Sequence, residues 1–171
     1  LALMLRLPIY LDSIGTILIG AWMGPFYGML PNMISGVLMG FTTDIYSLYF
    51  APVGMITGFM AGIAAKQMHG LVFEKQVKKL QIIIGALFIT IPGTMVSSVI
   101  NAVLFGGVTS SGSSILVQIL SRTPLGLTGS IFAVQIFTDY LDRVISLALV
   151  VMVLQMLPFS MKTAFQKAER K

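Results

Sequence analysis

Five long apolar runs, separated by short polar connectors, constrain this chain more than any other feature. They cover about Ser13–Met23, Phe26–Phe41, Tyr49–Ala65, Leu80–Leu104 and Thr128–Leu157. About 20 apolar residues in a helix cross the hydrocarbon core of a bilayer. Only 10% of the residues are charged, against about 25% in soluble domains. Because the runs extend from end to end, we expect one membrane domain over residues 1–171 and no separate soluble domain.

The opening segment Leu1–Leu7 is a sixth apolar stretch, too short to span a bilayer alone. Since the chain does not begin with Met, we expect this segment to be the end of a longer first helix that starts upstream. The sequence thus predicts an all-α membrane protein, a compact bundle of six transmembrane helices. Gly24-Pro25 predicts a tight turn between the second and third of them. Alternatively, Ser13–Leu30 is one Pro-kinked helix that turns at Pro31-Asn32.

The basic residues predict the orientation of this bundle. Eight of the eleven lie in two segments, the connector Lys66–Lys79 and the tail from Lys162 to Lys171. By the positive-inside rule both segments face the cytoplasm, and with six helices both termini do so too. This arrangement explains the net charge of +5 without a role in nucleic-acid binding. It also places three connectors outside: Pro8–Asp12, Thr42–Leu48 and Phe105–Leu127. Within the last of these, Ile115–Leu120 is a short interfacial helix, a lid, or part of a plain linker.

Polar side chains follow one face of the last predicted helix. Gln135, Asp139 and Arg143 are spaced four residues apart, with Asp142 beside Arg143. Ionisable groups at bilayer depth are costly and usually functional. One interpretation is a self-neutralising Asp139–Arg143 ion pair. The other is the polar wall of a pocket, where Gln135 and Asp139 form hydrogen bonds with a heteroaromatic solute.

Other polar and aromatic residues lie in the outer connectors or inside apolar runs. Asp12 or Ser13 is a suitable N-cap for the second helix, which offers a purely structural explanation for that segment. We expect two outer loops and three helices to converge on one outward-facing pocket, with aromatic rings for stacking and a few directed polar groups. The predicted substrate-binding residues are Arg6, Tyr10, Asp12, Asn32, Asp44, Tyr46, Tyr49, Asn101, Gln135, Asp139 and Arg143.

Signatures of enzymes, metal sites and cofactors are missing from the sequence. There is no cysteine, and the only histidine, His69, falls in the basic connector, where solvation is expected. No Gly-rich phosphate loop with a following lysine occurs. We therefore expect no catalytic residue, cofactor or metal, and we interpret the 12 Met residues as adaptable packing.

An alternative to a solute-binding protein is a self-sufficient proton-coupled carrier or channel with Asp139, Asp142 and Arg143 as a relay.

Glycine recurs at every fourth position in the second to fourth predicted helices. Such small-xxx-small patterns let helix backbones approach closely in lipid. They indicate either packing within this chain or docking against a separate membrane subunit. The residues predicted for docking are Gly20, Gly24, Gly28, Gly36, Gly40, Gly58 and Gly62.

The run YLDSIGTILIGAWMGPFYGMLPNMISG, followed by APVGMITGFMAG, resembles the substrate-binding S component of energy-coupling factor (ECF) vitamin transporters. The matching motifs are Leu11-Asp12-Ser13, Gly24-Pro25 with Gly28, and Pro52-Val53-Gly54. They cover about Pro8–Lys66, and the rest of the chain agrees in helix count and loop sidedness only. The alanine-rich docking motif of the family's first helix is not seen, which leaves the docking mode open.

The resemblance implies a multi-pass protein of the bacterial plasma membrane with both termini cytoplasmic. It implies a vitamin-sized ligand bound under the first, third and fifth connectors, near the outer surface. The implied partners are a membrane coupling (T) subunit and two cytoplasmic ATPase subunits. We therefore expect a high-affinity binding subunit, not an enzyme, that takes up a small heterocyclic vitamin or precursor. A hydroxymethylpyrimidine or pyridoxine-like ring is the preferred ligand, and riboflavin remains open.

Overall fold

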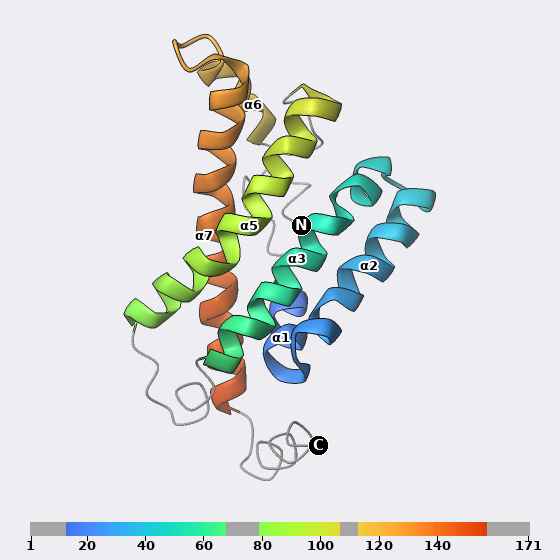
Figure 1. Ribbon diagram of the computed structural model, residues 1–171, viewed down its shortest axis with the longest axis vertical. Coiled ribbons are helices and arrows are strands. Elements are labelled where there is room, and N and C mark those ends of the chain that lie inside the picture. Colours follow the sequence, from blue (N-terminus) through green and yellow to red (C-terminus); the bar gives the residue numbers. More distant parts are fainter. Residues whose placement is uncertain (1–12, 68–78, 107–112, 157–171) are drawn as a thin grey trace.

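The computed structural model describes residues 13–67, 79–106 and 113–156 of the chain. Helices contain 93% of these residues and no strand occurs among them, so the all-α class is confirmed. The helices, labelled in Figure 1, are α1 (Ser13–Met23), α2 (Pro25–Thr42), α3 (Ile45–Gln67), α5 (Lys79–Phe105), α6 (Ser113–Leu120) and α7 (Gly126–Met156).

The predicted turn between α1 and α2 is confirmed. Gly24 lies between the two helices with φ of 100°, in a region that L side chains rarely adopt, and Pro25 opens α2. Helix α2 continues through Pro31. The alternative of one helix that turns at Pro31-Asn32 is therefore wrong, because the glycine and not the internal proline breaks the helix.

The other apolar runs correspond to α3, α5 and α7. Helix α3 extends beyond its predicted run at both ends, α5 matches its run to within one residue at each end, and α7 begins at Gly126 and is described to Met156. At the start of α3, Asp44 Oδ1 accepts a hydrogen bond from the backbone N–H of Tyr46 at 3.1 Å, so the helix begins at Ile45. The connector Phe105–Leu127, which we expect on the outside, contains α6, a short helix at the position of Ile115–Leu120. Leu1–Leu7 lies outside the described residues. The six observed helices are thus not the six predicted spans, because α6 has only eight residues.

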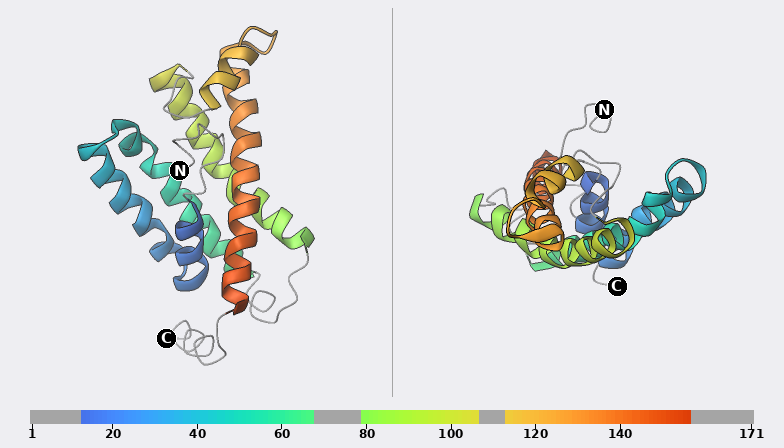
Figure 2. Two further views of the ribbon diagram at one scale, coloured as in Figure 1. Left: turned by 180° about the vertical axis from the view of Figure 1, so that it is seen from behind. Right: turned by 90° about the horizontal axis from the view of Figure 1, so that it is seen from above.

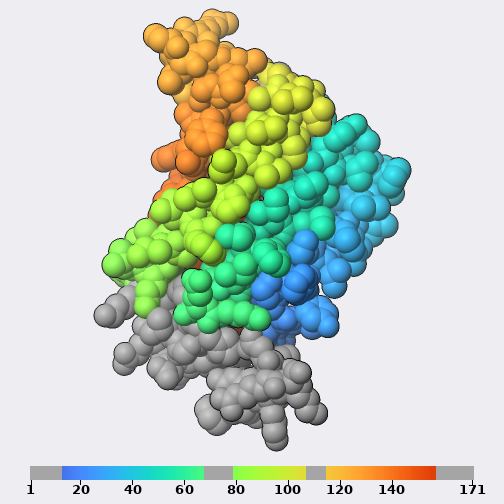
Figure 3. Space-filling view, viewed as in Figure 1, coloured from blue at the N-terminus to red at the C-terminus, as the bar shows by residue number. Residues whose placement is uncertain are grey.

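Four helices form a curved layer in the order α2, α3, α5, α7, and α1 lies on its inner side (Figure 2). Figure 3 shows the opposite, outer side, where α5 and α3 cross the middle of the molecule. The helices alternate in direction, so the α2–α3 turn, the end of α5 and the start of α7 lie at the upper end of Figure 1. The α1–α2 turn, the end of α3 and the end of α7 lie at the lower end.

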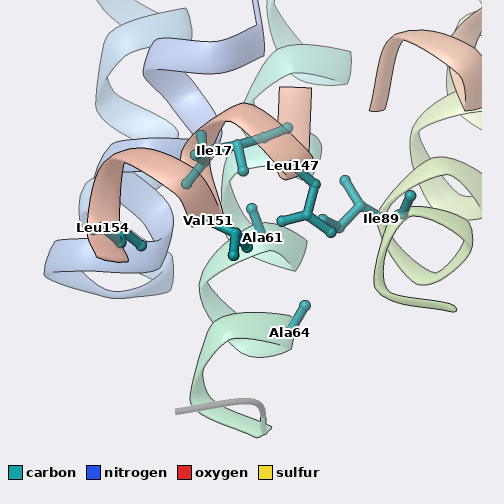
Figure 4. Packing of buried hydrophobic residues seen from close by; sticks show 9 residues of the cluster. Ile17, Ala61, Ala64, Ile89, Leu147, Val151 and Leu154 are labelled. Atoms are coloured by element: carbon teal, nitrogen blue, oxygen red, sulfur yellow. The ribbon is translucent and has the colours of Figure 1, made fainter. Parts of the chain in front are cut away.

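The hydrophobic core lies in the lower half, where α1 meets α3, α5 and α7 (Figure 4). Ile17 and Ile89 are fully buried there, and Leu154 is 1% exposed. Small side chains on α3, such as Ala61 and Ala64, let the helices come close. Contacts between α1 and this core fix the short helix against the layer.

Most of the glycines predicted for docking lie in contacts within the chain. A Cβ at Gly20 would meet the backbone of Gly58 at 2.5 Å, and a Cβ at Gly62 would meet Pro25 at 2.5 Å. A Cβ at Gly58 would overlap the carbonyl oxygen of Gly28. On the upper part of the α2–α3 contact, Gly36 lies against Ala51 and Gly40 against Leu48. These contacts favour the first interpretation, packing within the chain, and docking to a partner stays a prediction.

The outer surfaces of the helices carry many large apolar side chains. Phe26 and Phe41 of α2 are 75% and 78% exposed, and Val103 of α5 is 75% exposed. Helices α3 and α5 are each long and apolar enough to cross a membrane. Helix α7 is longer still, with 31 residues, but Asp139, Asp142 and Arg143 occupy its centre.

Candidate functional site

Polar side chains line the contact between α5 and α7 in the upper half of the molecule. We refer to them as the polar stripe: Thr94, Ser97, Ser98, Asn101, Gln135 and Asp139. The residues of α5 recur at three- and four-residue spacing, which places them on one side of the helix facing α7. Asn101 is 3% exposed and Gln135 8% exposed, whereas Asp139 is partly exposed. The polar stripe therefore lies between two helices that are otherwise apolar.

Hydrogen bonds between the two helices hold most of this stripe. Ser98 Oγ donates to Gln135 Oε1 at 2.7 Å, and Gln135 Nε2 donates to Ser97 Oγ at 3.0 Å. One turn further down α7, the Asp139 carboxylate accepts a hydrogen bond from Thr94 Oγ1 at 2.8 Å. A buried amide and a carboxylate that are paired in this way fix the register of α5 against α7.

A second polar group, the Arg143 cluster, lies where α1 and α3 meet α7. It consists of Ser13, Thr57, Asp142 and Arg143. Arg143 Nη1 lies 2.6 Å from Asp142 Oδ2 and also donates to Ser13 Oγ, while Nη2 donates to Thr57 Oγ1 at 3.4 Å. Ser13 Oγ donates in turn to Asp142 Oδ2 at 2.6 Å. One guanidinium thus links three helices.

Of the two interpretations of the polar face of α7, the Asp139–Arg143 ion pair is wrong. Arg143 pairs with the adjacent Asp142, which is 1% exposed, and Asp139 instead accepts from Thr94. Spacing of four residues allows the first pairing, but the guanidinium extends toward α1 and α3 while the Asp139 carboxylate lies against α5. Arg143 is therefore part of a buried internal cluster, distinct from the polar stripe to which Asp139 belongs.

Aromatic rings cluster at the upper end, one turn beyond the polar stripe. Tyr46 and Tyr49 of α3 lie 4.6 Å and 5.6 Å from Phe105, measured between ring centroids, and Phe50 stacks on the same ring at 5.9 Å. Phe105 follows Asn101 by four residues on α5. Tyr46 and Tyr49 therefore contact α5 one helical turn above Asn101.

Two other predicted site residues lie elsewhere. Asn32 of α2 donates to Thr16 of α1, and its side chain occupies the space where a Cβ on Gly54 would lie. Its contacts are thus with α1 and α3, away from α7. Asp44 caps α3 through its own turn. Arg6, Tyr10 and Asp12 lie outside the described residues.

Several residues that hold this arrangement together were not predicted: Ser13, Thr57, Thr94, Ser97 and Ser98. Their hydroxyls donate to Gln135, Asp139 and Asp142 or accept from Arg143 and Gln135. A signal was available on α5, where Thr90, Thr94, Ser97 and Ser98 precede Asn101 at helical spacing within an apolar run. The sequence-based site contained ionisable, amide and tyrosine side chains, and the serine and threonine hydroxyls that pair with Gln135 and Asp139 were absent from it.

The buried hydroxyl of Ser146 on α7 leads to a prediction about stability. Its Oγ is fully buried and has no hydrogen-bond partner. An unpaired buried hydroxyl costs about 1–3 kcal/mol, so Ser146→Ala is expected to leave the protein equally stable or raise its apparent Tm in detergent by a few degrees. A clear fall in Tm would show that the hydroxyl has a partner, such as a bound water.

Among the residues that the structure describes, no three His, Cys, Asp or Glu side chains are grouped in a way that would hold a metal ion. No family model, curated protein or solved structure matches this chain.

Proposed function

We propose that the chain is a multi-pass membrane protein that binds a small heterocyclic solute at the polar stripe between α5 and α7. The observation that carries this proposal is the distribution of polarity. Large apolar side chains cover the outside of α2, α5 and α7, and amides, hydroxyls and a carboxylate lie between α5 and α7. A water-soluble protein has the opposite arrangement, whereas a bilayer favours polar groups that face protein.

The chemistry of the stripe suits a neutral, polar ring. Gln135 and Asn101 offer amide donors and acceptors, Asp139 offers a partly exposed carboxylate, and Phe105 with Tyr46 offers aromatic surface at the upper end. Sites for small molecules combine apolar and aromatic walls with a few directed polar groups. The ring class that we favour remains a hydroxymethylpyrimidine-like or pyridoxine-like compound.

The resemblance to ECF S components supports a role in an ATP-driven importer of the bacterial plasma membrane. In that role the protein captures the solute outside and delivers it through a membrane coupling subunit driven by two cytoplasmic ATPases. The alternation of helix ends supports this topology, since α3 ends before the basic segment at the lower end of Figure 1, whereas α3 begins and α5 ends at the upper end.

The rival function is a proton-coupled carrier, which the buried Asp142–Arg143 pair favours. The two functions differ in their energy source. Purified chain alone in liposomes would take up solute under a pH gradient if it were a carrier. Uptake that requires the ATPase partners supports the importer.

Asp139→Ala tests the site directly. We expect the variant to bind the solute at least tenfold more weakly, a loss of about 1.4 kcal/mol, because the ligand loses a carboxylate at the one partly exposed position of the stripe on α7. The solute is first identified by native mass spectrometry of freshly purified protein, and affinity is then measured by calorimetry in detergent. Asn32→Ala is the matched control, expected to keep the affinity, because Asn32 contacts α1 and α3. Equal affinity of Asp139→Ala and wild type removes Asp139 from the site.

A further inference from the structure

The amide of Asn101 is the exception in the polar stripe. It is 3% exposed, yet its Oδ1 has no hydrogen-bond partner. A buried unpaired amide oxygen is costly, so native structures rarely keep one without a reason, such as a water or a ligand. The amide oxygen of Asn101 therefore lacks the partner that a buried acceptor normally has.

The neighbours of Asn101 show that this is a local feature and not a general lack of partners. One turn down α5, Ser97 and Ser98 are paired with the Gln135 amide, and below them Thr94 is paired with Asp139. These groups satisfy one another between α5 and α7. Asn101 is the stripe residue on which a bound molecule gains hydrogen bonds without first breaking existing ones.

The surroundings of Asn101 favour a flat ring over a water molecule. Phe105 lies one helical turn beyond it, in contact with Tyr46 and Tyr49. The adjacent residue on α5, Ala102, packs against the apolar cluster of Val117, Ile131 and Val134. A water needs two to four polar partners, whereas a heteroaromatic ring uses the amide at its edge and the apolar and aromatic groups at its faces.

We propose that Asn101 selects rings that present a hydrogen-bond donor and an acceptor at adjacent positions along one edge of the ring. In a 4-aminopyrimidine, Oδ1 accepts from the exocyclic amino group and Nδ2 donates to the adjacent ring nitrogen. Asparagine pairs with adenine by the same pattern in nucleic-acid recognition. A cyclic amide edge satisfies the flipped amide equally well. A pyridine nitrogen flanked by carbon substituents does not, so this inference, which rests on the proposed function, disfavours pyridoxine-like rings.

Two probe compounds of similar shape test the inference. One is 2-methylpyrimidin-4-amine, and the other is 2,4-dimethylpyrimidine, which has a methyl group where the donor was. We expect the full chain in lipid nanodiscs to bind the amine at least tenfold more tightly, by ligand-observed NMR. In Asn101→Leu the two affinities become equal within about twofold, since the discriminating amide is gone. Asn101→Asp keeps the size and the acceptor but loses the donor, so both the affinity for the amine and the preference fall.

Thermal stability separates recognition from a structural role. Without ligand, Asn101→Leu is expected to melt at the same temperature or higher, because a buried unpaired amide is replaced by an apolar group. Ser146→Ala, which removes the other unpaired buried side-chain group among the described residues, keeps the tenfold preference. Wild-type protein that binds both rings equally overturns the Asn101 inference and leaves the proposed function standing. Binding of neither ring overturns the Asn101 inference, and the proposed function is then decided by the search for a co-purified solute and by Asp139→Ala. A less stable Asn101→Leu that retains the preference assigns the amide to the fold and overturns the inference.

Discussion

A Gly58→Ala variant is expected to be about 3 kcal/mol less stable than the wild type, which corresponds to a fall of roughly 10 °C in apparent Tm. The added methyl group would overlap the carbonyl oxygen of Gly28 and crowd the methyl group of Thr16. Carbonyl oxygens of a helix cannot rotate away as flexible side chains do, so α2 and α3 must separate. The measurement is thermal unfolding in detergent, followed by tryptophan fluorescence or by loss of soluble protein.

Gly15→Ala is the matched control for that experiment. Gly15 is exposed on α1, and a Cβ there would meet nothing within 4 Å. Alanine favours a helix over glycine by about 1 kcal/mol, so this variant is expected to be as stable as the wild type or slightly more stable. If both variants melted at the same temperature, the close α2–α3 contact would not exist in the protein.

The difference between Gly58 and Gly15 also shows how far the sequence alone predicts the fold. The fourfold glycine spacing indicated close helix contacts, and Gly24-Pro25 indicated the turn, because both effects are local or periodic. Whether Gly58 faces Gly28 or a separate subunit depends on which helices meet. That choice involves residues far apart in the chain, and spacing within one helix contains no information about it.

In the candidate site, too, periodic features could be predicted from the sequence, whereas contacts between distant residues could not. Periodicity on α7 identified Gln135, Asp139 and Arg143 as one face. Gln135 and Asp139 do form hydrogen bonds with hydroxyl groups of α5. The alternative that paired Arg143 with Asp139 is wrong, because a long flexible side chain reaches any group within several ångströms. Asn32 was included because it is an amide in an apolar helix, but that fact alone does not tell which neighbouring helix it faces. Partner choice of this kind follows only from the packing of α1 between α3 and α7.

The Arg143 cluster leads to the second large prediction. Arg143→Met is expected to destabilise the protein by about 3–5 kcal/mol, because the Asp142 carboxylate, 1% exposed, loses the guanidinium that lies 2.6 Å away. The hydrogen bonds from Arg143 to Ser13 and Thr57 disappear as well, which loosens α1 and α3 from α7. Thermal unfolding in detergent is the measurement. Arg143→Lys is expected to be intermediate, because an ammonium group keeps the charge but lacks the two-pronged geometry.

The double variant Asp142→Asn with Arg143→Met separates charge from packing. If the loss in the single variant comes from an uncompensated buried charge, removal of that charge should recover most of the stability. If the double variant is as unstable as Arg143→Met, the guanidinium acts mainly through its bonds to Ser13 and Thr57. The same variant also bears on function, since a carrier that uses Asp142 and Arg143 as a relay loses transport when both are neutral. A binding subunit that uses the polar stripe, which is separate from this cluster, keeps its affinity for the solute once the fold is restored.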